Sequence, residues 1–81
     1  MIYMSNFFEK HRLKKEIKIC RQTIDEIERK RSRSQSALVQ AVLLQETPDE
    51  RDVEWFNKYT GEITACRNYM IDLQKKLDSL D

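Results

Sequence analysis

The sequence predicts an all-α protein, an antiparallel two-helix coiled-coil hairpin that assembles into a four-helix bundle dimer. Small and apolar residues recur at alternating steps of four and three over residues 13–41, and again over residues 56–80. Such a period keeps one face of a slightly under-wound helix against a partner helix. A turn signal separates the two segments, and the 81 residues include one Gly and one Pro. Residues 1–81 are therefore expected to form a single domain.

We call the two repeating stripes the seam, because they are expected to face each other between the helices. The first stripe consists of Leu13, Ile17, Cys20, Ile24, Ile27, Arg31, Ser34, Leu38 and Ala41. The second stripe consists of Phe56, Tyr59, Ile63, Cys66, Met70, Leu73, Leu77 and Leu80. A composition with 36% charged and 40% hydrophobic residues suits long amphipathic helices.

Capping patterns predict where each helix begins. Asn6 is followed three residues later by Glu9, which forms a capping-box pattern for the first helix. Thr47 is placed to cap the second helix, with Pro48 at the first helical position, where its missing N–H costs nothing. The expected elements are a first helix over about residues 7–45, a turn at 46–48 and a second helix over about 48–79.

The middle of the seam is predicted to be weak. Arg31 and Ser34 are polar residues at seam positions, and the second helix contains Gly61, which costs ~1 kcal/mol relative to Ala inside a helix. We interpret this stretch as a polar layer that sets the register, with Glu62 as the partner of Arg31. A kink or fraying point is the alternative.

Both cysteines belong to the seam. If facing residue numbers add up to about 97 or 94, Cys20 and Cys66 are separated by ~16 or ~10 Å along the helix axis. A disulfide needs Cα atoms within about 7 Å, so two free thiols in a reducing, cytoplasmic compartment are expected. No segment approaches the ~20 apolar residues that span a bilayer, and no membrane partner is expected.

The chain carries more apolar residues than one seam can bury. The surplus falls into one cluster near the turn and another at the open end of the hairpin. Exposed apolar patches mark interaction surfaces, and an isolated hairpin of this size is marginally stable. The expected interface residues are Tyr3, Phe7, Phe8, Val39, Val42, Leu43, Leu44, Val53, Trp55 and Tyr69.

The positions of the two clusters favour self-association. Because they lie at opposite ends, an antiparallel pair of hairpins brings the turn of one copy onto the N-terminal aromatic residues of the other. The expected partner is therefore a second copy, as a homodimer. A heterologous helical protein that covers the same surface is the alternative.

Residue types that carry catalysis are scarce. His11 is the one histidine, and a nucleophile needs both a base and an orienting group. The sequence contains no Glu-x-x-His motif of di-iron bundles and no Gly-rich phosphate loop. We therefore expect a non-enzymatic interaction module, such as an adaptor, a subunit or a chaperone-like protein, with no cofactor and no metal.

The charge distribution raises a second function. Residues 1–46 have ten Lys/Arg and six Asp/Glu, a net +4, whereas residues 47–81 have five and eight, a net −3. Attraction between the two helices explains this difference, and a basic face for RNA or DNA is the alternative. Acidic residues interrupt that face, and the pI of 7.8 is low for a nucleic-acid binder. The expected contacts are Lys14, Lys15, Lys18, Arg29, Lys30 and Arg33.

Overall fold

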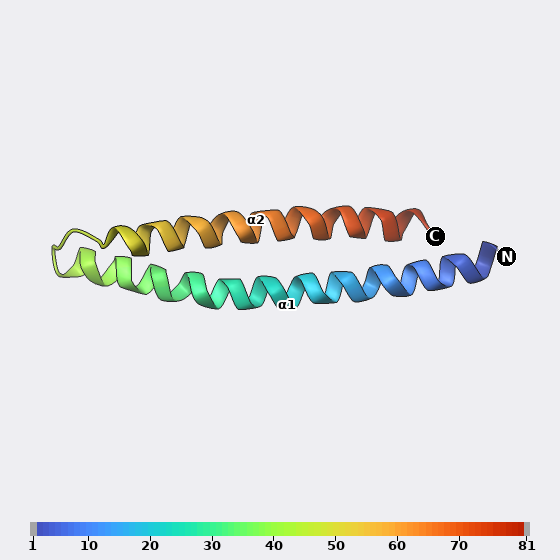
Figure 1. Ribbon diagram of the computed structural model, residues 1–81, viewed down its shortest axis with the longest axis horizontal. Helices are drawn as coiled ribbons and strands as arrows, with labels where there is room; N and C mark the ends of the chain where they lie inside the picture. Colours follow the sequence, from blue (N-terminus) through green and yellow to red (C-terminus); the bar gives the residue numbers. More distant parts are fainter. Residues whose placement is uncertain (1, 81) are drawn as a thin grey trace.

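The computed structural model describes residues 2–80, with side chains from residue 6 onward, as two antiparallel helices (Figure 1). Helix α1 spans Ile2–Leu43 and helix α2 spans Glu50–Ser79. No strand is present between residues 2 and 80, and α1 packs against α2 in a molecule of 65 × 16 × 14 Å. The all-α, two-helix prediction is confirmed. The four-helix bundle stays a prediction.

The seam is buried as predicted. All of its residues are buried or half-buried, whereas most residues outside it are exposed. The two most deeply buried large side chains, Leu13 and Ile63, are each 1% exposed. Full burial of such a side chain contributes ~1.5–3 kcal/mol. The seam is therefore the source of the hydrophobic free energy that holds α1 against α2.

Burial along the seam is uneven. We call the end that contains residues 7–21 and 67–80 the open end, and the end around the loop, residues 35–62, the closed end (Figure 1). The main buried cluster lies at the open end and consists of Leu13, Ile17, Cys20 and Leu73, with Met70, Leu77 and Leu80 packed against it. At the closed end, the seam residues nearest the loop are only half-buried: Leu38, Ala41, Phe56 and Tyr59.

Helix α1 ends in a Schellman motif formed without glycine. The N–H of Gln45 donates to the carbonyl of Val42 at 3.1 Å, and the N–H of Glu46 donates to the carbonyl of Ala41 at 2.9 Å. Gln45 has φ 57°, a left-handed conformation that costs a residue with a Cβ roughly 1–2 kcal/mol. The helix therefore ends two residues earlier than expected, and a loop over residues 44–49 replaces the predicted turn at 46–48.

Asp49 caps helix α2, so the predicted cap at Thr47 is wrong. The Asp49 carboxylate accepts a hydrogen bond from the backbone N–H of Arg51 at 2.8 Å. A carboxylate at this position also interacts favourably with the helix dipole. Pro48 consequently precedes the cap and is not the first helical residue.

Helix α1 begins earlier than expected, so the predicted cap at Asn6 is also wrong. The helix already includes Ile2, and Asn6 lies within it. No Gly or Pro interrupts residues 2–13, and an established helix propagates at low cost through a residue that is merely a good cap. With 42 residues in α1 and 30 in α2, the N-terminal part of α1 extends beyond the end of α2 (Figure 1).

The register differs from both predicted registers, by a whole heptad from the first and by about half a heptad from the second. On one flank the Arg67 guanidinium donates to Glu28 at 2.7 Å, and on the other the Tyr69 hydroxyl donates to Glu16 at 3.4 Å. The residue numbers of these two pairs add up to 95 and 85. Facing residues of the seam, which lies between the two flanks, therefore have numbers that add up to about 90 rather than 97 or 94. The expected axial separation of the thiols is therefore too large, although both cysteines are free as predicted.

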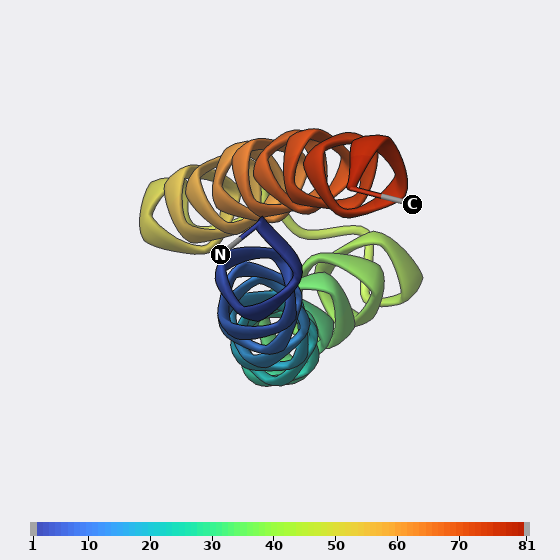
Figure 2. The ribbon, with the colours of Figure 1, turned by 90° about the vertical axis from the view of Figure 1, so that its right-hand side faces the viewer.

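The polar layer is present, but its predicted ion pair is not. Ser34 is buried in the seam at 8% exposure, and Arg31 is half-buried. Within the described residues Arg31 forms no ion pair with Glu62, and the recorded ion pair between the helices joins Arg67 to Glu28. Helix α2 continues through Gly61, while α1 curves along its length and α2 crosses it obliquely (Figure 2).

Replacing Gly61 with Ala is expected to stabilise the hairpin by up to ~1 kcal/mol, because Ala restricts the unfolded chain and favours the helix. The added Cβ would meet no atom within 4 Å. Urea unfolding followed by circular dichroism measures the change. The control Ile63→Ala should lose ~2–5 kcal/mol, since it leaves a cavity in the seam. A Gly61→Ala protein that is less stable than the wild type would contradict this placement of Gly61.

Gln45→Gly is expected to raise the free energy of unfolding by about 0.5–1 kcal/mol. Glycine adopts a positive φ without the clash that a Cβ causes, and this gain exceeds its cost in chain entropy. The same unfolding measurement applies. Gln45→Ala retains the Cβ and should bring no gain, so equal effects of the two substitutions would argue against a left-handed Gln45.

Candidate interaction surfaces

The apolar residues near the loop are exposed. We call this group the closed-end patch; it comprises Val39, Val42, Leu43, Leu44, Val53 and Trp55. Leu43 reaches 76% exposure, the highest of the large hydrophobic side chains in the described part of the chain. Because α2 is the only element within residues 2–80 that packs on α1, no described part of the hairpin covers these side chains. Exposed apolar side chains of this kind are typical of interaction surfaces. Val42 is two heptads from Glu28 and Trp55 is two heptads from Tyr69, so the patch extends over both flanks of the hairpin.

Trp55 is held in place by its neighbours in α2. Its ring stacks on Tyr59 with centroids 5.6 Å apart and an interplanar angle of 20°. The ammonium group of Lys58 lies 5.0 Å from the centre of the Trp55 ring, within cation–π range. Ordered aromatic side chains lose little entropy on binding and frequently act as anchors in interfaces.

A second apolar surface lies at the open end. Phe7 and Phe8, which we call the open-end patch, are 67% and 63% exposed. Their rings pack edge to face with centroids 5.7 Å apart. Tyr69 is also exposed as predicted, and the charge of nearby Glu16 raises the pKa of its hydroxyl. Tyr3, the tenth predicted interface residue, lies outside the described side chains.

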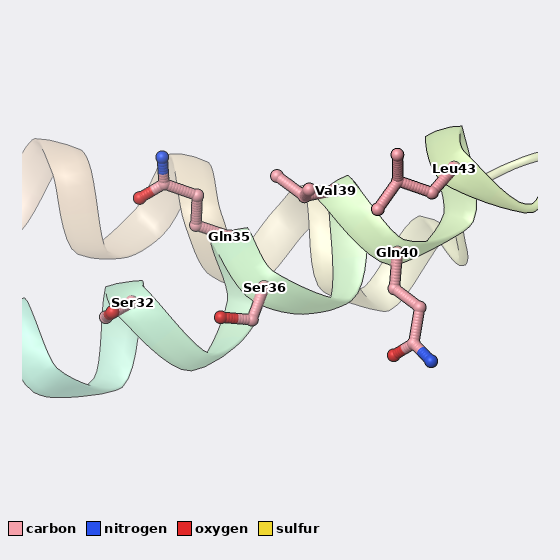
Figure 3. A pocket seen from close by; sticks show the side chains of 6 residues that line it. All are labelled: Ser32, Gln35, Ser36, Val39, Gln40 and Leu43. Atoms are coloured by element: carbon pink, nitrogen blue, oxygen red, sulfur yellow. The ribbon is translucent and has the colours of Figure 1, made fainter.

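The structure adds a feature that the sequence did not reveal, a shallow groove on the outer face of α1. We call it the outer groove; its lining residues are Ser32, Gln35, Ser36, Val39, Gln40 and Leu43 (Figure 3). The small Ser32 and Ser36 side chains allow another chain to approach α1 closely, and the amides can donate and accept hydrogen bonds. The groove runs into the closed-end patch, because Val39 and Leu43 belong to both.

Exposed Ile19 was also missed by the prediction. Its side chain is half-exposed although it lies in the most basic part of α1. A large apolar residue outside the seam stripe was the available signal, but a single residue between charged neighbours does not form a patch.

The predicted basic residues are all exposed, but they form two different groups. The first group consists of Lys14, Lys15 and Lys18. The two acidic residues of α1 nearest to it, Glu9 and Glu16, both form ion pairs with Arg12. Arg12 donates to Glu16 at 3.1 Å and also pairs with Glu9, and its hydrogen bond holds the pKa of the Glu9 carboxyl below its usual value.

The second basic group lies closer to acidic side chains. Arg29, Lys30 and Arg33 are exposed, but they follow directly after three acidic residues of the same helix, Asp25, Glu26 and Glu28. Local positive potential is therefore partly cancelled around this group. The first group, at Lys14–Lys18, is the better candidate for contact with an anion.

Among residues 2–80, no three His, Cys, Asp or Glu side chains are grouped so as to hold a metal ion. Neither of the two described helices has a stretch apolar enough to cross a bilayer. Comparison of the chain with known protein families, curated proteins and solved structures finds no match. The candidate sites are thus the two patches, the outer groove and the basic group.

Alkylation should distinguish the two thiols of the native protein. Cys20 is buried, and burial raises the pKa of its thiol, so the reactive thiolate is depleted at neutral pH. Cys66 is only half-buried. Iodoacetamide labelling followed by peptide mass spectrometry should therefore show Cys66 reacting several-fold faster, with similar rates in urea. Equal rates in the native protein would place Cys20 outside the seam.

Proposed function

We propose that the chain is a small non-enzymatic helical interaction module that packs its outer apolar surfaces against other helices, in the first place those of a second copy. The observation that supports this function is the exposure of nine predicted interface residues, which ranges from 40% to 76%. An adaptor, a subunit of an assembly or a chaperone-like protein acts through such surfaces. The free thiols of Cys20 and Cys66 support a cytoplasmic location.

The available area is sufficient for such a role. A specific dimer buries roughly 800 Å² on each partner. The hairpin has an accessible surface of 6686 Å², so about an eighth of it would be covered. The two patches and the outer groove lie on this surface, and burying them adds to the hydrophobic free energy that a single seam supplies.

Self-association is tested by sedimentation velocity and light scattering over a range of concentrations. The wild-type mass is expected to be about twice the 9.8 kDa of one chain. Leu43→Glu and Val42→Glu should each weaken the dimer at least ~10-fold, because a charge would be buried in the interface. Asn68→Glu adds the same charge at an exposed polar position and serves as the matched control.

The outcomes separate the alternatives. A wild-type protein that stays monomeric at all concentrations would refute self-association and assign the same surface to a heterologous helical partner. A dimer that resists both substitutions would show that the closed-end patch is not part of the interface.

Nucleic-acid binding is the second candidate. It is favoured by the exposure of Lys14, Lys15 and Lys18 and by the pairing of the nearest acidic side chains, Glu9 and Glu16, with Arg12. Three phosphate contacts predict that affinity for duplex DNA falls about 40-fold between 50 and 200 mM salt. Fluorescence anisotropy with labelled DNA and RNA measures this dependence. Lys18→Glu should weaken binding, whereas Lys75→Glu on α2 should not. Binding that is unaffected by salt would exclude this function.

A further inference from the structure

Because the chain folds back on itself, the two ends of the hairpin carry net charges of opposite sign. The open end, residues 7–21 and 67–80, carries nine Lys/Arg and four Asp/Glu, a net charge of +5. The closed end, residues 35–62, carries two Lys/Arg and six Asp/Glu, a net charge of −4. The hairpin is therefore positive at one end of its 65 Å length and negative at the other (Figure 1).

Four of the exposed apolar side chains at these two ends occupy the same side of α1. Phe7 and Val42 are five heptads apart, and so are Phe8 and Leu43. Residues a whole number of heptads apart keep the same position relative to the partner helix of a coiled coil. The two pairs thus lie on one flank of the hairpin, ~52 Å apart along α1.

We propose that a second copy docks antiparallel on this flank, so that the open-end patch of each hairpin covers Val42 and Leu43 of the closed-end patch and the outer groove of the other. The inference rests on the self-association proposed above; it keeps the antiparallel orientation that the sequence predicts and adds the flank that docks and the charges that favour this orientation. The two-fold axis passes near residue 25 of α1, halfway between the paired patches. Both contacts of the dimer are then identical, as a closed two-fold assembly requires.

Charge complementarity identifies both the occupant and its direction. An antiparallel pair sets +5 against −4 at both ends, whereas a parallel pair sets like charges against each other twice. Complementary charges across an interface set the orientation of the partners and suppress wrong pairings. The extension of α1 beyond α2 also leaves Phe7 and Phe8 accessible to the other copy. One chain therefore carries both halves of the proposed contact.

Disulfide trapping tests the orientation. In a Cys20→Ala, Cys66→Ala background, Phe8→Cys is mixed with Leu43→Cys, the two chains are refolded together, and the sample is mildly oxidised. Antiparallel docking predicts covalent dimers in the mixture and few in either variant alone. A parallel dimer predicts the reverse, with each variant linking to itself. Asn68→Cys mixed with Leu43→Cys is the matched control and should remain unlinked, since Asn68 lies on α2 outside the proposed contact.

Charge reversal tests the complementarity in chains that retain both native cysteines. Lys15→Glu with Lys18→Glu should weaken the dimer at least ~10-fold at low salt, and so should Glu46→Lys with Glu54→Lys. A chain with all four changes reverses both ends and should dimerise like the wild type. Raising salt should weaken the wild-type dimer.

The two levels of the hypothesis fail differently. A wild-type chain that sediments as a monomer refutes the proposed function and with it the docking. A wild-type dimer that links like positions, or that is strengthened by salt, refutes the antiparallel docking alone. Capture of anionic vesicles or nucleic acid by the monomer would assign the open end to that ligand instead.

Discussion

Burial of one apolar seam between two helices is the constraint on which the rest of this structure depends. No third element covers either helix within residues 2–80, so each side chain outside the seam lies on a surface or at its margin. Leu13 and Ile63 are buried because each helix covers one stripe of residues on the other helix, and both residues belong to these stripes. The same constraint leaves large side chains such as Leu43 and Phe7 in water. Exposed apolar surfaces are thus a direct consequence of the two-helix architecture.

The sequence predicted the features that depend on periodicity. Helical type, the two seam stripes and the exposed patches all follow from the spacing of apolar residues, because that spacing determines which face of a helix is buried. The axial offset was wrong by half a heptad to a whole heptad, since heptad stripes match almost equally well after such a shift. The sequence also offered more than one possible start for each helix. Asp49 and not Thr47 caps α2, and α1 begins at Ile2 and not after a cap at Asn6. The outer groove depends on the course of α1 in space and had no simple signature.

Because α2 runs antiparallel to α1, charged residues that are far apart in the sequence lie at the same end of the hairpin. Counted by helix, the charges suggest attraction between α1 and α2, yet just one ion pair between them, Arg67 with Glu28, is recorded among the described residues. Exposed pairs of this kind contribute ~0–1 kcal/mol. The distribution of charge between the two ends is therefore better suited to choosing partners and orientation than to stabilising the hairpin.

The uneven burial of the seam sets an order of local opening. Amide exchange follows local stability, and regions with few buried apolar contacts open first. The well-packed cluster around Ile17 and Leu73 holds the two free ends together, whereas half-buried Leu38 and Phe56 lie beside the covalent connection. At the closed end, where the loop links the helices, α1 and α2 consequently separate more readily in solution than at the open end. A partner that covers Leu43 would therefore slow amide exchange at the closed end.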